Sequence, residues 1–232
     1  MSSLSKNSSN SSLESLLNNG LETLQLSLNP QQISQLLNYV ALLEKWNKTY
    51  NLTAIRNPQD MLTEHVLDGL SIVNYLDRKK IIDVGTGAGI PGLICAIACP
   101  DKLFTLLDSN GKKTRFLTQV GFELGLKNIK ILNQRVEDCQ EKFEIITSRA
   151  FTSLTQMVVS CQHLLDQDHH GYFLAMKGPS VDQEIEALKK FQRTEQSFSI
   201  QSIEKIITLL SIIEQAGETD PKTRHCLLKV CC

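Results

Sequence analysis

The stretch KKIIDVGTGAGIPG, residues 79–92, decides the fold class of this chain. Its first half is a short apolar run, typical of a buried strand. Its second half is a turn with four glycines, at Gly85, Gly87, Gly89 and Gly92, and Pro91 there suits the first turn of a helix. A strand, a glycine-rich turn and a helix in this order are typical of a Rossmann-like nucleotide site, where bare backbone lets a ligand come close.

Segments of strand and helix character alternate through the following residues. Strands are expected at 80–85, 103–108, 128–133, 142–148 and 171–178, and helices at 91–99, 111–125, 153–165 and 181–191. This alternation predicts an α/β fold with a mostly parallel sheet that helices cover on both faces. Two last strand candidates, 198–206 and 224–230, follow without a clear helix between them, so we expect an antiparallel pair at one edge.

The first third of the chain has a different character. Residues 1–12 are rich in Ser and Asn and are expected to be disordered. Residues 13–77 are predicted to form an N-terminal helical extension, because Asn29 and Asn57 each precede a proline as an N-cap precedes a helix. Residues 78–232 are predicted to form the α/β domain.

Composition excludes several classes of protein. The 232 residues are 41% hydrophobic and 21% charged, with a net charge of -1, so any surface for a nucleic acid must be local. No apolar run has the length of a membrane span, and the N-terminus lacks the apolar stretch of a signal peptide.

Seven cysteines, an odd number lying mostly in apolar runs, indicate a reducing compartment, and we expect a cytoplasmic monomer. No metal is expected, because His225, Cys226, Cys231 and Cys232 lack a CxxC pair.

The glycine loop has two competing registers. Gly85-x-Gly87-x-Gly89 is the pattern of S-adenosylmethionine-binding methyltransferases, whereas Gly87-x-Gly89-x-x-Gly92 matches the dinucleotide fingerprint. Asp83 favours the first register, because a carboxylate before the loop repels a pyrophosphate but suits the ammonium group of a methionine. The start of the following helix, near Ile90, can then face the methionine carboxylate.

A second carboxylate supports the same cofactor. Asp108 ends the next strand, 23 positions beyond Gly85. A carboxylate at this place can accept hydrogen bonds from both hydroxyls of a ribose. The residues alone therefore predict an S-adenosylmethionine site, with a nicotinamide-dependent reductase and a pure binding module as the rival hypotheses.

Six motifs, in this order, make a more specific pattern: YNLTAIRNPQDMLTEHVLDGLS (50–71), DVGTGAGIPG (83–92), FTLLDSNGKKTRFL (104–117), NQRVED (133–138), ITSRAF (146–151) and FLAMKG (173–178). Together they resemble the RsmG family, formerly GidB, of bacterial methyltransferases that act on small-subunit ribosomal RNA. The resemblance runs from about Leu36 to Lys229. One departure is Cys95, in GLIC, where many members have proline; it concerns packing of a helix and not the cofactor.

The resemblance implies a class I, Rossmann-like methyltransferase fold with a seven-stranded sheet and an N-terminal helical extension. It implies transfer of a methyl group to N7 of guanine 527 in 16S ribosomal RNA, with the RNA or the small-subunit particle as partner. Because neutral guanine N7 carries a lone pair and no proton, no catalytic base is expected. The cofactor contacts that it implies, with those of the loop and the ribose, are Gly85, Gly87, Gly89, Ile90, Asp108, Val136, Glu137 and Arg149.

Basic residues near the predicted site are candidates for RNA contacts. Lys112, Lys113 and Arg115 begin the helix after Asp108, where they either hold phosphates or form a solvated helix face. Lys177 ends the fifth strand at the ligand edge of the sheet and resembles the KG motif of the family. Phe151 either stacks on the target base or belongs to the core. A protein or small molecule as methyl acceptor remains an alternative at this point.

Overall fold

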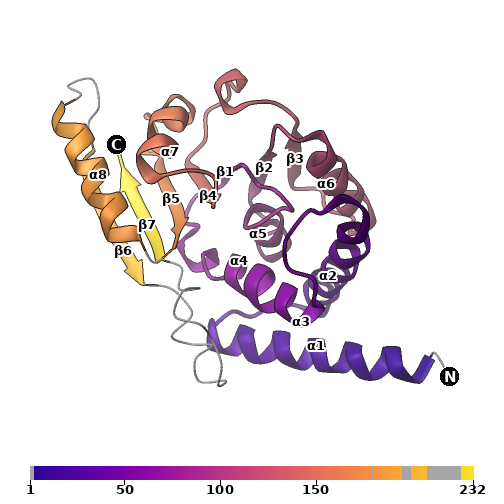
Figure 1. Cartoon of the computed structure of the whole chain (residues 1–232). Helices are drawn as coiled ribbons and strands as arrows, with labels where there is room; N and C mark the ends of the chain where they lie inside the picture. The colour runs from indigo at the N-terminus through magenta and orange to yellow at the C-terminus, as the bar shows by residue number, and fades with distance from the viewer. Residues whose placement is uncertain (1–2, 179, 195–199, 208–225) are drawn as a thin grey trace.

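A computed structural model describes residues 3–178, 180–194, 200–207 and 226–232. Its centre is a seven-stranded sheet with the order β3-β2-β1-β4-β5-β7-β6 (Figure 1). The strands are β1 (Lys80–Val84), β2 (Leu103–Leu107), β3 (Ile129–Leu132), β4 (Ile145–Arg149), β5 (Tyr172–Lys177), β6 (Ser202–Ile207) and β7 (Cys226–Cys231). The first five run parallel, and β7 runs antiparallel to both β5 and β6. The predicted antiparallel pair at one edge is confirmed.

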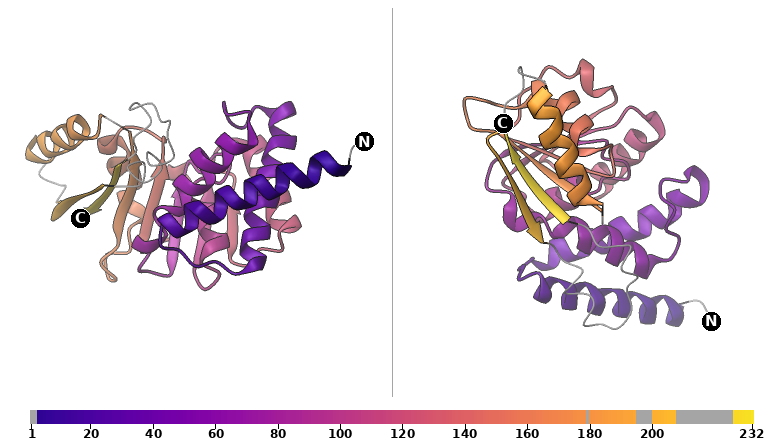
Figure 2. Two further views of the ribbon diagram at one scale, coloured as in Figure 1. Left: turned by 90° about the horizontal axis from the view of Figure 1, so that it is seen from below. Right: turned by 60° about the vertical axis from the view of Figure 1, so that its left-hand side comes forward.

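Alternation along the strands divides the core into two layers. Ile81 and Ile82 are neighbours in β1 and are both fully buried, but they belong to two different hydrophobic clusters, one on each face of the sheet. Helices α5 (Gly92–Ala98) and α6 (Gly111–Glu123) contribute to the first cluster, and α7 (Leu154–Cys161) and α8 (Val181–Thr194) to the second. The prediction of a sheet covered on both faces is confirmed (Figure 2).

The N-terminal helices cover the first face. They are α1 (Ser3–Thr23), α2 (Pro30–Tyr50), α3 (Pro58–Met61), the π-helical turn η1 (Leu62–Leu67), α4 (Asp68–Leu70) and the 3₁₀ turn η2 (Val73–Tyr75). Asn29 caps α2 with a complete capping box, and Asn57 caps α3, as the sequence predicts. The apolar residues of α2 and η1 lie in the same cluster as those of β1, β2 and β5. The division of the chain at residue 77 therefore stays a prediction, since the helices and the sheet share one core.

Helix α1 extends into the Ser/Asn-rich segment 1–12, whose disorder stays a prediction. Helix α1 begins at Ser3 and continues to Thr23. Leu17 and Leu21 of this helix are buried, and Leu13 and Leu16 pack against the same cluster. No proline interrupts the chain before these leucines, so the helix that their packing stabilises extends back through the Ser/Asn-rich residues.

His225, part of the metal cluster considered above, lies outside the described residues. Within the described residues, no helix is both long and apolar enough to cross a membrane. Cys95, at the departure from the family pattern, is fully buried, and its Sγ donates to the carbonyl of Gly69 at 3.4 Å. It therefore packs α5 against α4.

The sheet reverses its direction of growth at β1. From β1 the chain adds β2 and then β3 on one side, and later β4 and β5 on the other. In an open α/β sheet, a ligand binds outside the carboxyl ends of the strands at such a switch point. The loops after β1, β2, β3 and β4 are therefore the expected place for a site.

Gly92 shows how closely the first helix lies on the sheet. A Cβ at this position would lie 2.5 Å from Cδ2 of Leu106 and 2.6 Å from Cβ of Asp83. Gly92 lies inside the helix that the sequence predicts at 91–99, and its lack of a side chain permits the contact of this helix with the sheet.

We expect Gly92→Ala to lower the free energy of unfolding by about 1–3 kcal/mol, because the new methyl group overpacks α5 on β1 and β2. Gly111→Ala is the matched control: its Cβ would meet only Asn133 Oδ1, at 3.4 Å, and Gly111 has no positive φ. Urea unfolding measures both. Equal stability of the two variants would contradict the packing assigned to Gly92.

Candidate functional site

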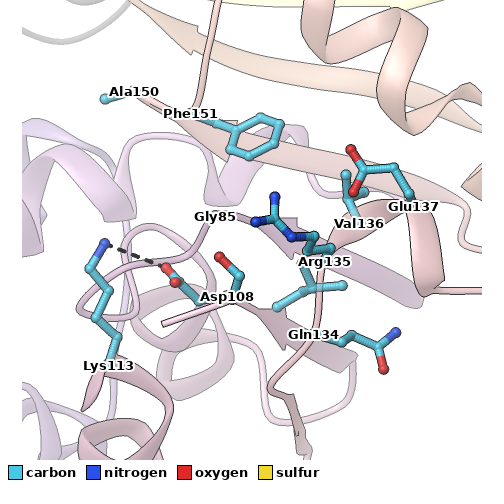
Figure 3. Close-up of a pocket in the computed structure, with 11 residues that line it drawn as sticks. Gly85, Asp108, Lys113, Gln134, Arg135, Val136, Glu137, Ala150 and Phe151 are labelled. Carbon is cyan, nitrogen blue, oxygen red and sulfur yellow. Dashed lines mark ion pairs between the residues drawn. The ribbon is translucent and has the colours of Figure 1, made fainter. Parts of the chain in front are cut away.

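A pocket of about 280 Å³ lies at the switch point of the sheet (Figure 3). Four loops contribute to it, each from the carboxyl end of a different parallel strand. The lining residues are Gly85 after β1, Leu107, Asp108, Ser109 and Lys113 at the end of β2 and the start of α6, Gln134, Arg135, Val136 and Glu137 after β3, and Ala150 and Phe151 after β4. The fold thus gathers residues that are far apart in the sequence.

Asp83, in the interior of the protein, fixes the glycine loop by hydrogen bonds. It is fully buried, and its Oδ2 accepts hydrogen bonds from the Thr86 hydroxyl at 2.6 Å and from the Gly92 amide at 2.8 Å. Oδ1 is buried with no hydrogen-bond partner among the described residues. The side chain therefore holds the loop and the start of α5, which corrects the expectation that it faces the ammonium group of a ligand.

The same contact argues against the dinucleotide register. In that register a pyrophosphate lies against the start of the helix that follows the loop. Here the Gly92 amide at the start of α5 already donates to the Asp83 carboxylate. A phosphate in its place would meet a buried acidic group.

Asp108 holds the loop from its other side and also faces the pocket. Its Oδ2 accepts a hydrogen bond from the Gly87 amide at 3.0 Å and lies 3.6 Å from Nζ of Lys113. Its Oδ1 accepts from the Asn110 amide at 2.8 Å. A carboxylate has about four acceptor positions, so Asp108 retains capacity for hydroxyl groups of a ligand. Gly87 adopts a φ of +61°, which lets its amide point at Asp108.

The predicted cofactor residues divide into two groups. Gly85, Asp108, Val136 and Glu137 line the pocket. Gly87, Gly89 and Ile90 do not belong to this lining. A Cβ on Gly89 would lie 2.8 Å from Leu117 of α6, so this glycine serves close packing, and Ile90 is buried in the first core cluster.

Arg149 points away from the pocket. Its Nη1 donates to the Glu64 carbonyl at 2.7 Å and lies 2.9 Å from Oδ2 of Asp68. The reason is strand alternation: Ile145, four positions earlier in β4, faces the first cluster, and Arg149 faces the same side, under η1 and α4. His65, which also contacts Arg149, has its pKa lowered to about 4 by burial and by the arginine charge, so it is neutral at pH 7.

The predicted RNA-binding residues also divide. Lys112 and Arg115 are exposed on α6, whereas Lys113 lines the pocket beside Asp108. Lys177 is 7% exposed and forms an ion pair with Glu184 of α8 at 2.9 Å, with a further hydrogen bond to the Thr152 carbonyl. Its position in β5 turns it under α7 and α8, which corrects the expectation that it lies on an RNA surface.

Sequence reasoning passed over three polar lining residues: Ser109, Gln134 and Arg135. Each follows the carboxyl end of a strand, and Arg135 lies between the Asp108 and Glu137 side chains in Figure 3. Their position after β2 and β3 was a usable signal. Phe151, left between two interpretations, lines the pocket and is 37% exposed.

Comparison with known proteins gives a consistent result. Residues 32–208 match the family model described as rRNA small subunit methyltransferase G. A protein of Alteromonas mediterranea named ribosomal RNA small subunit methyltransferase G is 50% identical over 176 residues, which cover 75% of this chain and 82% of that protein. A protein of Marinobacter nauticus with the same name is 50% identical over 186 residues, covering 79% and 86%.

Solved structures agree at the level of the fold. An S-adenosylmethionine-dependent O-methyltransferase from Thermotoga maritima is similar with a TM-score of 0.56 and 16% identity, over 81% of this chain and 70% of that one. Magnesium protoporphyrin IX methyltransferase from Synechocystis PCC 6803 gives a TM-score of 0.55 and 15% identity, over 88% and 98%. The predicted class I methyltransferase fold is confirmed.

The buried carboxyl group of Asp83 predicts a pH effect on stability. Burial raises its pKa from 3.8 to about 6, although the hydrogen bonds from Thr86 and Gly92 act in the opposite direction. Between about pH 4 and pH 6 the folded chain holds a proton that the unfolded chain has released. The free energy of unfolding therefore falls as the pH rises through this window.

We expect Asp83→Asn to lack this fall, since its amide does not titrate. Relative to the unmodified chain, the variant gains roughly 2–3 kcal/mol between pH 4 and pH 6, while the other ionisable groups, His65 included, contribute equally to both. Urea unfolding at intervals of pH measures the difference. A stability gap that stays constant across the window would show that Asp83 is already ionised in the folded protein.

Proposed function

Because this chain belongs to the rRNA small subunit methyltransferase G family, we propose that it transfers a methyl group from S-adenosylmethionine to N7 of guanine 527 in 16S ribosomal RNA. Membership in the family supports the RNA as substrate. The observation that carries the cofactor assignment is the pocket at the switch point, with Asp108 on one side and Glu137 on the other.

The lining of the pocket fits S-adenosylmethionine better than a polyanion. Two carboxylates, Asp108 and Glu137, and two cations, Lys113 and Arg135, belong to it. Such a lining suits a ligand that carries a sulfonium, an ammonium and a carboxylate group, whereas a pyrophosphate would meet the two acids. Asp108 would accept hydrogen bonds from the ribose hydroxyls, and the buried side chain of Val136 would pack on the adenine.

When bound, S-adenosylmethionine supplies a sulfonium methyl group that an acceptor lone pair takes up, while the electrons of the broken carbon–sulfur bond stay on sulfur. Guanine N7 has such a lone pair and needs no deprotonation, so no residue of this chain is assigned as a general base. The protein contributes alignment: the loop from Gly85 to Gly89, fixed by Asp83 and Asp108, holds the methyl donor in one place. The polar lining then adapts to the loss of charge on sulfur.

The exposed residues of α6 would position the RNA. Lys112 and Arg115 lie on the helix that begins directly after Asp108, so a phosphate bound there would lie close to the methyl donor. Such contacts fix the orientation of an RNA without reading its sequence. Lys113, beside Asp108, is assigned to the cofactor side instead.

Asp108→Asn tests the cofactor assignment. We expect the dissociation constant of S-adenosylmethionine to rise about 10- to 100-fold, because hydrogen bonds to a charged acceptor contribute about 1.5–3 kcal/mol. Isothermal titration calorimetry measures it. Asp101→Asn, an exposed aspartate in the turn before β2, is the matched control and should bind as the unmodified chain does.

The same titration with NAD addresses the reductase alternative. The unmodified chain should release or absorb no measurable heat with NAD. Tight binding of NAD without binding of S-adenosylmethionine would refute the cofactor assignment, and an Asp108→Asn variant with full affinity would remove Asp108 from the site.

The product can be tested in the RNA of living cells. N7-methylguanine carries a fixed positive charge on its imidazole ring, so reduction followed by aniline should cleave 16S RNA at the modified guanine. Cells without the gene for this protein should give no cleavage there, and its return should restore the cleavage. Primer extension locates the break. A cleavage that persists in the deletion strain would mean that another enzyme makes the modification.

A further inference from the structure

Phe151 is an aromatic side chain with an unusual place in this fold. The chain continues from β4 into a turn, and Phe151 lies there with its ring toward the pocket (Figure 3). It is 37% exposed, whereas Phe143, which precedes β4, and Phe173, near the start of β5, are fully buried. Its exposure excludes a purely structural role in the core, which was one of the two interpretations of the sequence.

The ring lies directly against the glycine loop. A Cβ on Gly85 would lie 2.5 Å from Cδ2 of Phe151, so the bare backbone at this position leaves room for the ring. One edge of the ring is thus fixed on the loop that would hold the methyl donor. The rest of it forms an apolar surface next to a pocket whose other lining groups are largely polar.

The backbone before Phe151 is strained. Ala150 has a φ of +52°, in the left-handed region that residues with a Cβ rarely adopt. Such conformations persist only where the surrounding structure enforces them, and they gather at functional sites. Here the strained residue sets the direction of the side chain that follows it.

Interior contacts enforce this turn from both sides. Before it, Arg149 is held by the Glu64 carbonyl and the Asp68 carboxylate. After it, the ammonium group of Lys177 donates to the Thr152 carbonyl, and the Leu154 amide donates to Glu184. The buried charges at the ends of β4 and β5 therefore serve to hold the segment that carries Phe151.

From this geometry we propose that the ring of Phe151 is the platform on which the acceptor base stacks during methyl transfer. The inference rests on the proposed function and names the residue that holds the target purine. A flat ring beside the methyl donor is suited to a flat acceptor, since base–aromatic stacking works through the faces of both. A purine on this ring would lie next to the pocket, with an in-plane nitrogen free to face the methyl group.

Stacking on Phe151 would also favour the reaction itself. As the methyl group moves to N7, the purine acquires a positive charge. The face of an aromatic ring attracts a cation, so the ring binds the charged base more tightly than the neutral one. An interaction that strengthens toward the transition state raises the rate of the chemical step, not only the affinity for the RNA.

Two substitutions at this position separate stacking from bulk. Phe151→Leu keeps an apolar side chain but removes the ring, and Phe151→Tyr keeps the ring. We measure methyl transfer to 16S RNA and to small ribosomal subunits, both prepared from cells that lack the enzyme. On the substrate that the unmodified chain methylates, we expect the single-turnover rate to fall roughly 5- to 100-fold in Phe151→Leu. Phe151→Tyr should retain a rate within about threefold of the unmodified chain. Phe122→Leu, at an exposed phenylalanine on α6 outside the pocket lining, is the matched control.

The affinity for S-adenosylmethionine, measured without RNA, decides between an acceptor contact and a cofactor contact. Because Phe151 also lines the cofactor pocket, the platform predicts that Phe151→Leu loses a larger factor in rate than in affinity for S-adenosylmethionine, while Phe151→Tyr keeps both. A Phe151→Leu variant that loses cofactor affinity in proportion to its rate would overturn the proposal, because the ring would then hold the methyl donor. A fully active Phe151→Leu variant would also overturn it.

Cofactor binding and activity of the unmodified chain show which of the two proposals has failed, the platform or the proposed function on which it rests. If it binds S-adenosylmethionine but transfers no methyl group to the RNA or to the small ribosomal subunit, the proposed function fails, and the platform fails with it. If it is active on the RNA and Phe151→Leu is equally active, the platform alone fails.

Discussion

The glycine loop after β1 is held between two buried carboxylates, and the site depends on this arrangement. Asp83 binds the loop and the start of α5 through Thr86 and Gly92, while Asp108 binds the Gly87 amide from the neighbouring strand. Without these contacts a loop with three glycines at positive φ would have many conformations. The carboxylates therefore convert a flexible sequence into a fixed wall of the pocket. Burial of the Asp83 carboxyl group disfavours its charged form, and this raises its pKa to about 6.

The N-terminal helices support this wall from outside the sheet. The hydroxyl group of Tyr39, on α2, donates to the Ala88 carbonyl in the glycine loop at 2.9 Å. Gln32, near the start of the same helix, donates to the Ile97 and Ala98 carbonyls at the end of α5. Together with the contacts of Arg149 to η1 and α4, these bonds make the helices part of the site's support.

Much of this could be predicted from the sequence. The strand, loop and helix around Gly85 and the place of Asp108 follow from the rule that ligands meet the carboxyl ends of parallel strands. Val136 and Glu137, after β3, were implied by the resemblance to the family. The packing role of Gly92 was also predictable, because its spacing places it inside the helix. These features depend on the order of strands, loops and helices along the chain, which can be predicted from a single sequence.

Other features depend on which face of a strand a side chain occupies, and there the sequence was a poor guide. Arg149 and Lys177 both end strands at the ligand edge, yet they turn under helices on opposite faces of the sheet. A shift of one residue in the strand would exchange inward and outward positions. The expectation that Asp83 faces the ligand failed for a related reason. Helix α5 buries this side chain, and such a tertiary contact does not follow from the local sequence. The part of α1 after residue 12 was predicted, but its extension back to Ser3 was not, because the leucines that pack on the core lie later in the helix.

The most direct test of the account is a crystal structure of this protein with S-adenosylhomocysteine, the demethylated product of the methyl donor. We expect the ligand in the pocket at the switch point, with its ribose hydroxyls on Asp108, its adenine beside Val136 and its sulfur near the loop at Gly85. Asp83 should stay buried beneath the loop, and the ring of Phe151 should remain open toward the place of the missing methyl group. A ligand bound elsewhere, or one whose ribose does not reach Asp108, would contradict the account.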